Sequence, residues 1–184
     1  MEFAKTKLDG VLILKPKVFP DERGYFFESY SEKIFHNEGM YLDFVQDNIS
    51  FSKKGTIRGL HYQVGENAQG KFCQVLSGRV IDVAVDIRFG SPTFGEHVAV
   101  ELSDENHNQI WIPPGFAHGF SVLSDTAIFH YKCTAIYSKK DERAILFNDS
   151  DLNIDWKVDV LNISEKDLKG TAFKDIGKDF LYTD

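Results

Sequence analysis

The stretch "KFCQVLSGRVIDVAVDIRFG", residues 71–90, decides the fold. Two strand-like runs flank Ser77-Gly78, which predicts a β-hairpin with its turn at these two residues. In the second run, side chains alternate with the period of a strand. One face would carry Ile81, Val83, Val85 and Ile87, and the other Asp82, Ala84, Asp86 and Arg88. If Asp82 faces inward it needs a partner, because an unpaired buried carboxylate is costly.

Similar short strands continue on both sides of this stretch. We expect them over residues 11–19, 25–30, 44–52 and 56–63, and through several turns over 95–138. Short strands with regular turn signals indicate a β-sandwich or a β-barrel. One clear helix is expected over 31–39, with Ser31 as its N-cap and Gly39 at its end. The segments 163–170 and 174–184 are expected to be loop with short helical turns.

The composition sets limits on the class of protein. A chain of 184 residues suits a single domain, which we expect to span 1–184. A net charge of -7 argues against a nucleic-acid partner. No apolar run approaches the roughly 20 residues of a membrane span, and the first residues lack the apolar stretch of a signal peptide. We therefore expect no membrane partner and a cytoplasmic location. Cys73 and Cys133 both lie in apolar strand-like runs, so we expect them to be buried free thiols.

The segment "TIRGLHYQ", residues 56–63, carries charge where a strand should be half buried. Arg58 and His61 are three residues apart, so in a regular strand they would face opposite sides. Gly59 lies between them, and a bulge there would redirect one of the two. We expect His61 to point into the barrel and Arg58 to reach an anion at its rim.

Several residues together suit acid–base chemistry, although each alone has an ordinary structural explanation. His61 is a natural general base near neutral pH, and its carboxylate partner would be Asp82 or Asp167. Tyr131 is a candidate to donate a proton from the opposite side, and Lys71 is a candidate to stabilise a developing oxyanion. This combination suits proton abstraction next to a carbonyl, followed by reprotonation.

The sequence also contains part of a known metal-binding motif. The segment "PPGFAH", residues 113–118, resembles the later part of the metal motif of double-stranded β-helix (cupin) proteins, with His118 as the late ligand. The earlier His-x-His pair is missing, because Gln63 stands two residues after His61. The motif therefore predicts no metal site, and no cofactor is expected.

Over almost its whole length the chain resembles the dTDP-4-dehydrorhamnose 3,5-epimerases. The resemblance rests on these motifs, in order: "KVFPDERGYFFESY", "FVQDN", "RGLHYQ", "GENAQGK", "DVAVDIRFGSPTFG", "LSDEN", "WIPPGFAHGF", "YKCT", "IDW" and "SEKD". It implies a mainly β fold, a double-stranded β-helix (cupin-like jelly roll) with short helices in the N- and C-terminal regions. It also implies a homodimer in which N-terminal strands help to complete the partner's sheet.

The resemblance implies a reaction as well. The substrate would be dTDP-4-dehydro-6-deoxy-D-glucose, whose C3 and C5 are inverted to give dTDP-4-dehydro-L-rhamnose, without a metal or redox cofactor. His61 would remove the protons with Asp167 as its partner, Tyr131 would return a proton from the other face, and Lys71 would lie near the oxyanion. The implied substrate contacts are Arg23, Glu28, Gln46, Asp47, Asn48, Arg58, Lys71, His118, Glu142 and Lys166.

Further expectations concern individual residues and rival functions. Arg23 and Arg58 would hold the diphosphate or nucleotide, Tyr137 would stack on the nucleotide, and His130 would face away from Tyr131. The stretch "KFCQ", residues 71–74, lacks the basic residue that often follows the family's lysine. The alternatives are a 3-only or 5-only epimerase, an enzyme for another nucleotide-linked 4-keto sugar, a metal-dependent oxygenase, and a non-catalytic sugar-nucleotide binding module.

Overall fold

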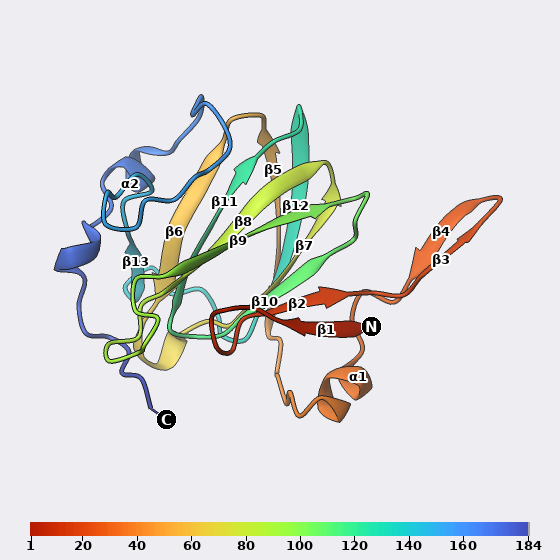
Figure 1. Ribbon diagram of the computed structural model, residues 1–184, viewed down its shortest axis with the longest axis horizontal. Helices are drawn as coiled ribbons and strands as arrows, with labels where there is room; N and C mark the ends of the chain where they lie inside the picture. The colour runs from red at the N-terminus through yellow and green to blue at the C-terminus, as the bar shows by residue number, and fades with distance from the viewer. Residues whose placement is uncertain (184) are drawn as a thin grey trace.

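Two antiparallel sheets face each other in the computed structural model, which describes residues 1–183 (Figure 1). The six-stranded sheet has the order β1 (Glu2–Lys5), β2 (Leu12–Lys15), β10 (Gln109–Ile112), β7 (Lys71–Ser77), β12 (Thr126–Cys133) and β5 (Gln46–Lys53). The five-stranded sheet has the order β13 (Glu142–Ala144), β6 (Ile57–Gln63), β11 (Phe116–Val122), β8 (Arg79–Asp86) and β9 (His97–Ser103). From β5 onward most consecutive strands alternate between the two sheets, which confirms the mainly β, double-stranded β-helix prediction.

The predicted hairpin over residues 71–90 is wrong. Strand β7 pairs with β10 and β12, whereas β8 pairs with β9 and β11 in the opposite sheet. The turn at Gly78 therefore carries the chain across the edge of the sandwich, with φ at +84° and no room for a side chain. A tight turn between two apolar strands is compatible with a hairpin or with a corner between packed sheets, and the local sequence does not distinguish them.

The alternation predicted for β8 is confirmed, and both of its faces are buried. Asp82 and Ala84 face the core between the sheets, where Phe116, Phe120 and Phe129 also pack. The opposite face of β8 belongs to a second cluster, which covers the outside of the five-stranded sheet. Its members include Val83, Val85, Ile87, Ala117, Leu152, Trp156 and Ile176. The C-terminal segment thus serves as an outer layer, and burying each large apolar side chain contributes about 1.5–3 kcal/mol.

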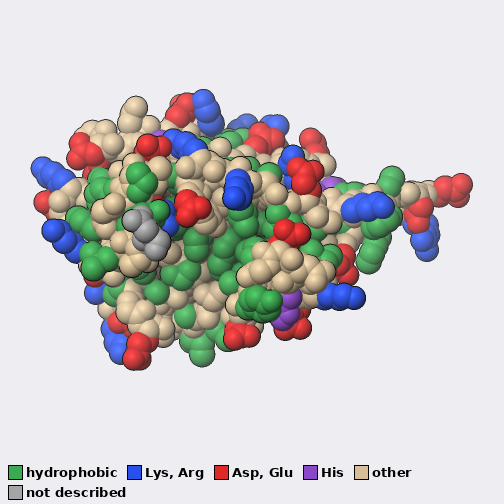
Figure 2. Space-filling view, turned by 60° about the horizontal axis from the view of Figure 1, so that its bottom comes forward, with side chains coloured by type: hydrophobic (Ala, Val, Ile, Leu, Met, Phe, Trp, Pro, Cys, Tyr) green, Lys and Arg blue, Asp and Glu red, His purple; other side chains and the backbone are tan. Residues whose placement is uncertain are grey.

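The N-terminal region differs from its prediction. The strand expected over 11–19 is interrupted at Pro16, because proline cannot donate to a sheet ladder, and continues as β3 (Val18–Asp21). Strand β4 (Gly24–Phe27) pairs with β3, and it ends before the predicted residue 30. These two strands form an arm that stands away from the two sheets (Figure 1). Figure 2 shows hydrophobic side chains along this arm and charged side chains at its tip.

The helical predictions are confirmed, with one correction. Helix α1 (Glu32–Asn37) begins after Ser31, but the Ser31 side chain makes no capping hydrogen bond; its backbone carbonyl accepts from the N–H of Phe35 instead. Gly39 follows the helix with φ at +77°. The tail contains α2 (Glu165–Leu168) and a 3-10 turn, Phe173–Asp175, with another 3-10 turn earlier at Gly65–Asn67. Asp184, at the end of the predicted tail, lies outside the described residues.

Two further predictions concern single features of the chain. Cys73 and Cys133 are both buried and free, as expected. Among residues 1–183, no helix is long and apolar enough to cross a membrane.

Candidate active site

A cavity of about 840 Å³ opens between the two sheets. Strands β5, β6, β7, β11 and β12 contribute to its wall, and the segment 161–167 closes one side. Seven residues expected from the sequence line it: Arg58, His61, Lys71, His118, Tyr131, Lys166 and Asp167. They come from segments far apart in the chain, so the fold brings most of the proposed acid–base and anion-binding groups together.

A bulge in β6 explains how Arg58 and His61 reach the same cavity. His61 pairs with His118 and Arg58 with Phe120, so β6 advances three residues where β11 advances two. Gly59 lies within the extra step at φ +121°. A Cβ atom on Gly59 would lie 2.5 Å from the Cα of Gly119, so the two strands approach too closely for a side chain there. The predicted bulge is confirmed, and with it both residues line the cavity, His61 partly buried and Arg58 exposed.

His61 is held by a buried carboxylate. Its Nε2 lies 2.5 Å from Oδ1 of Asp167, which is on α2. Burial raises the pKa of Asp167, but the hydrogen bond and charge of His61, with smaller contributions from Ser164 and the Gly59 backbone, outweigh it and lower that pKa. Asp167 therefore stays a carboxylate. It orients the ring so that Nδ1 is the nitrogen left to take a proton.

The choice between two carboxylates for His61 is settled by geometry. Asp82 lies on β8 and pairs with His118 instead, with 2.9 Å between its Oδ2 and the Nε2 of His118. Burial lowers the pKa of His118, although Asp82 opposes the shift. The site thus contains two His–Asp pairs, whose histidines lie on the neighbouring strands β6 and β11. His61 pairs with Asp167, and His118 pairs with Asp82.

Tyr131 on β12 and Lys71 on the neighbouring strand β7 both line the cavity, two register positions apart, since Tyr131 pairs with Cys73 and Lys71 with Cys133. Burial, with smaller contributions from Cys133 and Cys73, raises the pKa of Tyr131 to about 12, so its hydroxyl keeps its proton near neutral pH. Burial also lowers the pKa of Lys71. Within residues 1–183 the Lys71 ammonium has no ion-pair or hydrogen-bond partner, which leaves it free to bind an anionic oxygen.

Other expected contacts do not line this cavity. Arg23 lies at the tip of the arm, 89% exposed and paired with Asp21, and Glu28 follows the arm. Gln46, Asp47 and Asn48 lie on β5, where Asp47 binds Lys132 with 2.8 Å between its Oδ1 and the ammonium. Glu142 on β13 pairs with Lys166 and accepts from the hydroxyl of Tyr137 at 3.0 Å. Within one chain, all six of these expected contacts lie outside the set of residues that line the cavity.

Some lining residues were not anticipated. They are Ser50, Phe51, Ser52, Lys53, Thr56, Ile57, Phe120, Leu161, Asn162, Ile163 and Ser164. Ser52 accepts a hydrogen bond from Nε of Arg58 at 2.9 Å and so fixes the guanidinium. The only hint of it in the sequence is that Ser50 and Ser52 alternate with apolar residues, which is ordinary for a strand and does not indicate a contact with Arg58. His130, by contrast, hydrogen bonds to Gln74 and is not among the lining residues, as expected.

Known proteins resemble this chain over most of its length. The family model for dTDP-4-dehydrorhamnose 3,5-epimerase matches residues 5–175. The chain is 54% identical to the dTDP-4-dehydrorhamnose 3,5-epimerase of Shigella flexneri over 176 residues, covering 95% of this chain and 97% of that protein. It is 56% identical to that of Salmonella typhimurium over 165 residues, covering 89% and 90%.

A solved structure extends the likeness to the whole fold. The dTDP-6-deoxy-D-glucose-3,5-epimerase of Legionella pneumophila, in complex with dTDP-4-keto-L-rhamnose, aligns with a TM-score of 0.95 at 46% identity, covering 100% of this chain and 99% of that one. Sequence, fold and the grouping of His61, Lys71 and Tyr131 agree with the resemblance found in the motifs. The chain belongs to the dTDP-4-dehydrorhamnose 3,5-epimerase family.

Proposed function

We propose that this chain is a single cytoplasmic catalytic domain that inverts C3 and C5 of dTDP-4-dehydro-6-deoxy-D-glucose to give dTDP-4-dehydro-L-rhamnose, in the route to dTDP-L-rhamnose. One observation carries the proposal: a carboxylate-held His61 and a protonated Tyr131 line the same cavity in a member of this family. A module that only bound a nucleotide sugar would need neither of these groups.

The proton transfers follow from the side chains. The 4-keto group of the substrate acidifies the hydrogens on C3 and C5. Nδ1 of His61 takes one of them, and the electrons of the broken C–H bond form an enolate whose oxyanion lies near the Lys71 ammonium. The hydroxyl of Tyr131 then donates a proton to the opposite face of the same carbon. His61 releases its proton to water, Tyr131 regains one from water, and the cycle repeats at the second carbon.

The substrate's diphosphate and nucleotide would be held around the mouth of the cavity. Arg58 and Lys166 provide positive charge there, and Arg58 retains N–H groups beyond those bound to Ser52 and the Phe51 carbonyl. Tyr137 is half exposed and available to stack on the nucleotide base. His118 and Glu142 are proposed to complete the contacts with the sugar nucleotide.

The reaction can be tested by incubating the protein with dTDP-4-dehydro-6-deoxy-D-glucose in deuterated water and following the sugar by proton NMR. We expect the C3 and C5 signals to disappear as the rhamnose configuration forms. A Tyr131→Phe variant should slow inversion roughly 100-fold or more while still allowing exchange, because the base remains but the opposing acid is lost. Exchange at one carbon only would indicate a mono-epimerase, and no exchange with a bound nucleotide sugar would indicate a binding module.

We also propose that the protein is a homodimer whose arm completes the partner's site. Phe19, Tyr25 and Phe26 on the arm are exposed in the single chain, and so are Ile49 and Phe51 on β5 at the edge of the six-stranded sheet. Large apolar side chains gathered on an arm and on a sheet edge are typical of surfaces covered in an assembly. An exchange of arms would bring Arg23 and Glu28 of one chain to the cavity of the other.

Mixed dimers test this arrangement directly. The Arg23→Ala variant should raise KM roughly 10- to 100-fold, because a charge-assisted hydrogen bond to the diphosphate is lost. When Arg23→Ala and His61→Asn chains are unfolded, mixed and refolded together, about a quarter of wild-type activity should return, since each mixed dimer would hold one intact site. If Arg23 served the cavity of its own chain, mixing would restore nothing. A monomeric protein would contradict the proposal outright.

A further inference from the structure

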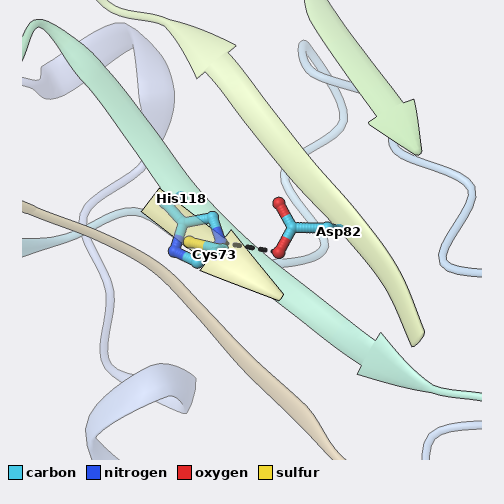
Figure 3. Close-up of side chains that lie close together, drawn as sticks. All are labelled: Cys73, Asp82 and His118. Carbon is cyan, nitrogen blue, oxygen red and sulfur yellow. Dashed lines mark hydrogen bonds and ion pairs between the residues drawn. The ribbon is translucent and has the colours of Figure 1, made fainter. Parts of the chain in front are cut away.

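A second group of reactive side chains lies behind the wall of the cavity, apart from the His61–Asp167 pair, and only its member His118 lines the cavity. Cys73, Asp82 and His118 come from β7, β8 and β11 and meet between the sheets, where they are 0%, 0% and 6% exposed. Figure 3 shows the three side chains converging, with the thiol of Cys73 next to the imidazole. One sulfur, nitrogen or oxygen atom from each lies within 4.8 Å of the others.

Asp82 is only half satisfied in this group. Its Oδ2 accepts from His118, but its Oδ1 is buried and has no hydrogen-bond partner among the described residues. A buried carboxylate oxygen without a partner is costly, and such an atom indicates a site for water or a cation. Water could satisfy Oδ1 alone, but it would not use the neighbouring thiol. The sulfur therefore points to a ligand with higher affinity for soft donors.

We propose that Cys73, Asp82 and His118 form a binding site for a thiophilic divalent cation such as Zn²⁺, and that its occupation inhibits the enzyme. Thiolate, imidazole and carboxylate are the ligands that Zn²⁺ takes in proteins, whereas Mg²⁺ and Ca²⁺ prefer oxygen atoms. Ligand atoms of a tetrahedral zinc site lie about 3.3–3.7 Å apart, so side-chain shifts of roughly 1 Å would complete the geometry. The fourth position would face the cavity.

The charges in the proposed site balance. A thiolate and a carboxylate together neutralise Zn²⁺, which makes a buried complex tolerable in a region with little water. Binding releases one proton to solvent, from the thiol of Cys73. His118 remains neutral, because its proton moves from Nε2 to Nδ1 when Nε2 binds the metal. The cation would reach the buried site from the cavity past His118, which is the one proposed ligand that lines it.

Inhibition is expected because Lys71 lies on the same face of β7, two residues before Cys73. Binding changes the net charge of this group from -1 to zero, so the attraction of the Asp82 carboxylate for the Lys71 ammonium is lost. The proposed reaction needs that ammonium near the enolate oxygen. The site differs from the cupin metal motif, whose second histidine is replaced by Gln63. It shares only His118 with that motif.

Direct binding measurements test the site without relying on the epimerase reaction. Zn²⁺ is titrated into the metal-free protein against a chromogenic chelator, and Cd²⁺ is added separately to detect the ultraviolet thiolate-to-metal absorption. We expect one equivalent per chain, and at least about tenfold weaker binding with loss of the Cd²⁺ absorption in Cys73→Ser. Cys133→Ser is the matched control, because it alters the other buried thiol and should retain binding. Asp82→Asn provides a second ligand variant if Cys73→Ser folds poorly.

The outcomes separate this site from others in the cavity. His61→Asn should still bind Zn²⁺, and Zn²⁺ should inhibit the wild-type enzyme more strongly than Cys73→Ser. The proposal is overturned if no stoichiometric binding occurs at micromolar metal, if Cys73→Ser and Asp82→Asn bind as tightly as the wild type, or if the His61 or Cys133 variant loses binding instead. Mg²⁺ at the same concentration should neither compete nor inhibit.

Discussion

The His61→Asn enzyme is expected to retain between about a hundredth and a ten-thousandth of wild-type kcat, with KM changed little. Asparagine keeps much of the shape of the ring but cannot take a proton from C3 or C5. The side chain also loses the 2.5 Å contact between Nε2 and the Asp167 carboxylate. Exchange of the C3 and C5 protons in deuterated water measures the effect, and both signals should persist.

Two further variants separate the effect of losing the base His61 from the effect of losing the carboxylate that holds it. Asp167→Asn should lose roughly 100-fold or more, because the amide no longer stabilises the imidazolium or selects the ring tautomer. His36→Asn, the same change on helix α1, should leave the rate unaltered. If His61→Asn raised KM while kcat stayed the same, His61 would be a binding group. A lowered melting temperature with proportional loss of activity would make its role structural.

The Gly59→Ala protein is expected to be less stable than the wild type by about 3–5 kcal/mol, or to fail to accumulate as folded protein. Its new methyl group would lie 2.5 Å from the Cα of Gly119 and 2.6 Å from the carbonyl oxygen of His118. Both obstacles are backbone atoms, so relief requires β6 and β11 to separate. Urea unfolding measures the loss, and any folded fraction should show reduced activity because Arg58 and His61 are redirected.

Gly24→Ala is the control for this prediction. Gly24 has φ at +131°, close to the +121° of Gly59, but a Cβ atom there would meet nothing within 4 Å. Its substitution should cost about 1–2 kcal/mol or less, since only backbone strain is introduced. Equal losses in the two variants would show that strain, and not the close approach of the two strands, makes Gly59 necessary.

The fold could be predicted from the sequence where a pattern depends on neighbouring residues. The prediction failed where strands that are distant in the chain pair with each other. The alternation along β8 correctly put Asp82 and Ala84 on one face and Val83 and Val85 on the other, because side-chain direction depends only on neighbouring residues. Which of the two faces lies between the sheets was left open. The partners of β7 and β8 could not be obtained that way. Both strands are apolar, and the turn at Gly78 fits a hairpin as well as a corner. The arm was also missed, since no local signal shows that β3 and β4 leave the sheets after Pro16.

The site shows the same division. Residue types and the resemblance indicated His61, Lys71, Tyr131 and Asp167, and the structure places all four at one cavity. From residue types alone, Asp82 and Asp167 were equal candidates to hold His61, because residue types do not show which segments lie close together in space. Ser52 was missed because a serine in a strand is ordinary until its contact with Arg58 is known. Contacts that depend on pairing between distant strands can be assigned only from the three-dimensional structure.

The location of Asp167 has a consequence for how the protein is made. His61 is translated 106 residues before the carboxylate that holds it. The segment that covers the outer face of the five-stranded sheet, with Leu152, Trp156 and Ile176, follows β13 in the chain. A ribosome that stalls after β13 would release a chain with an apolar surface bare and its base without a partner. Competence for proton transfer therefore arises only after Asp167 has been synthesised. Incomplete chains are exposed to chaperones and proteases before they can act on a sugar nucleotide.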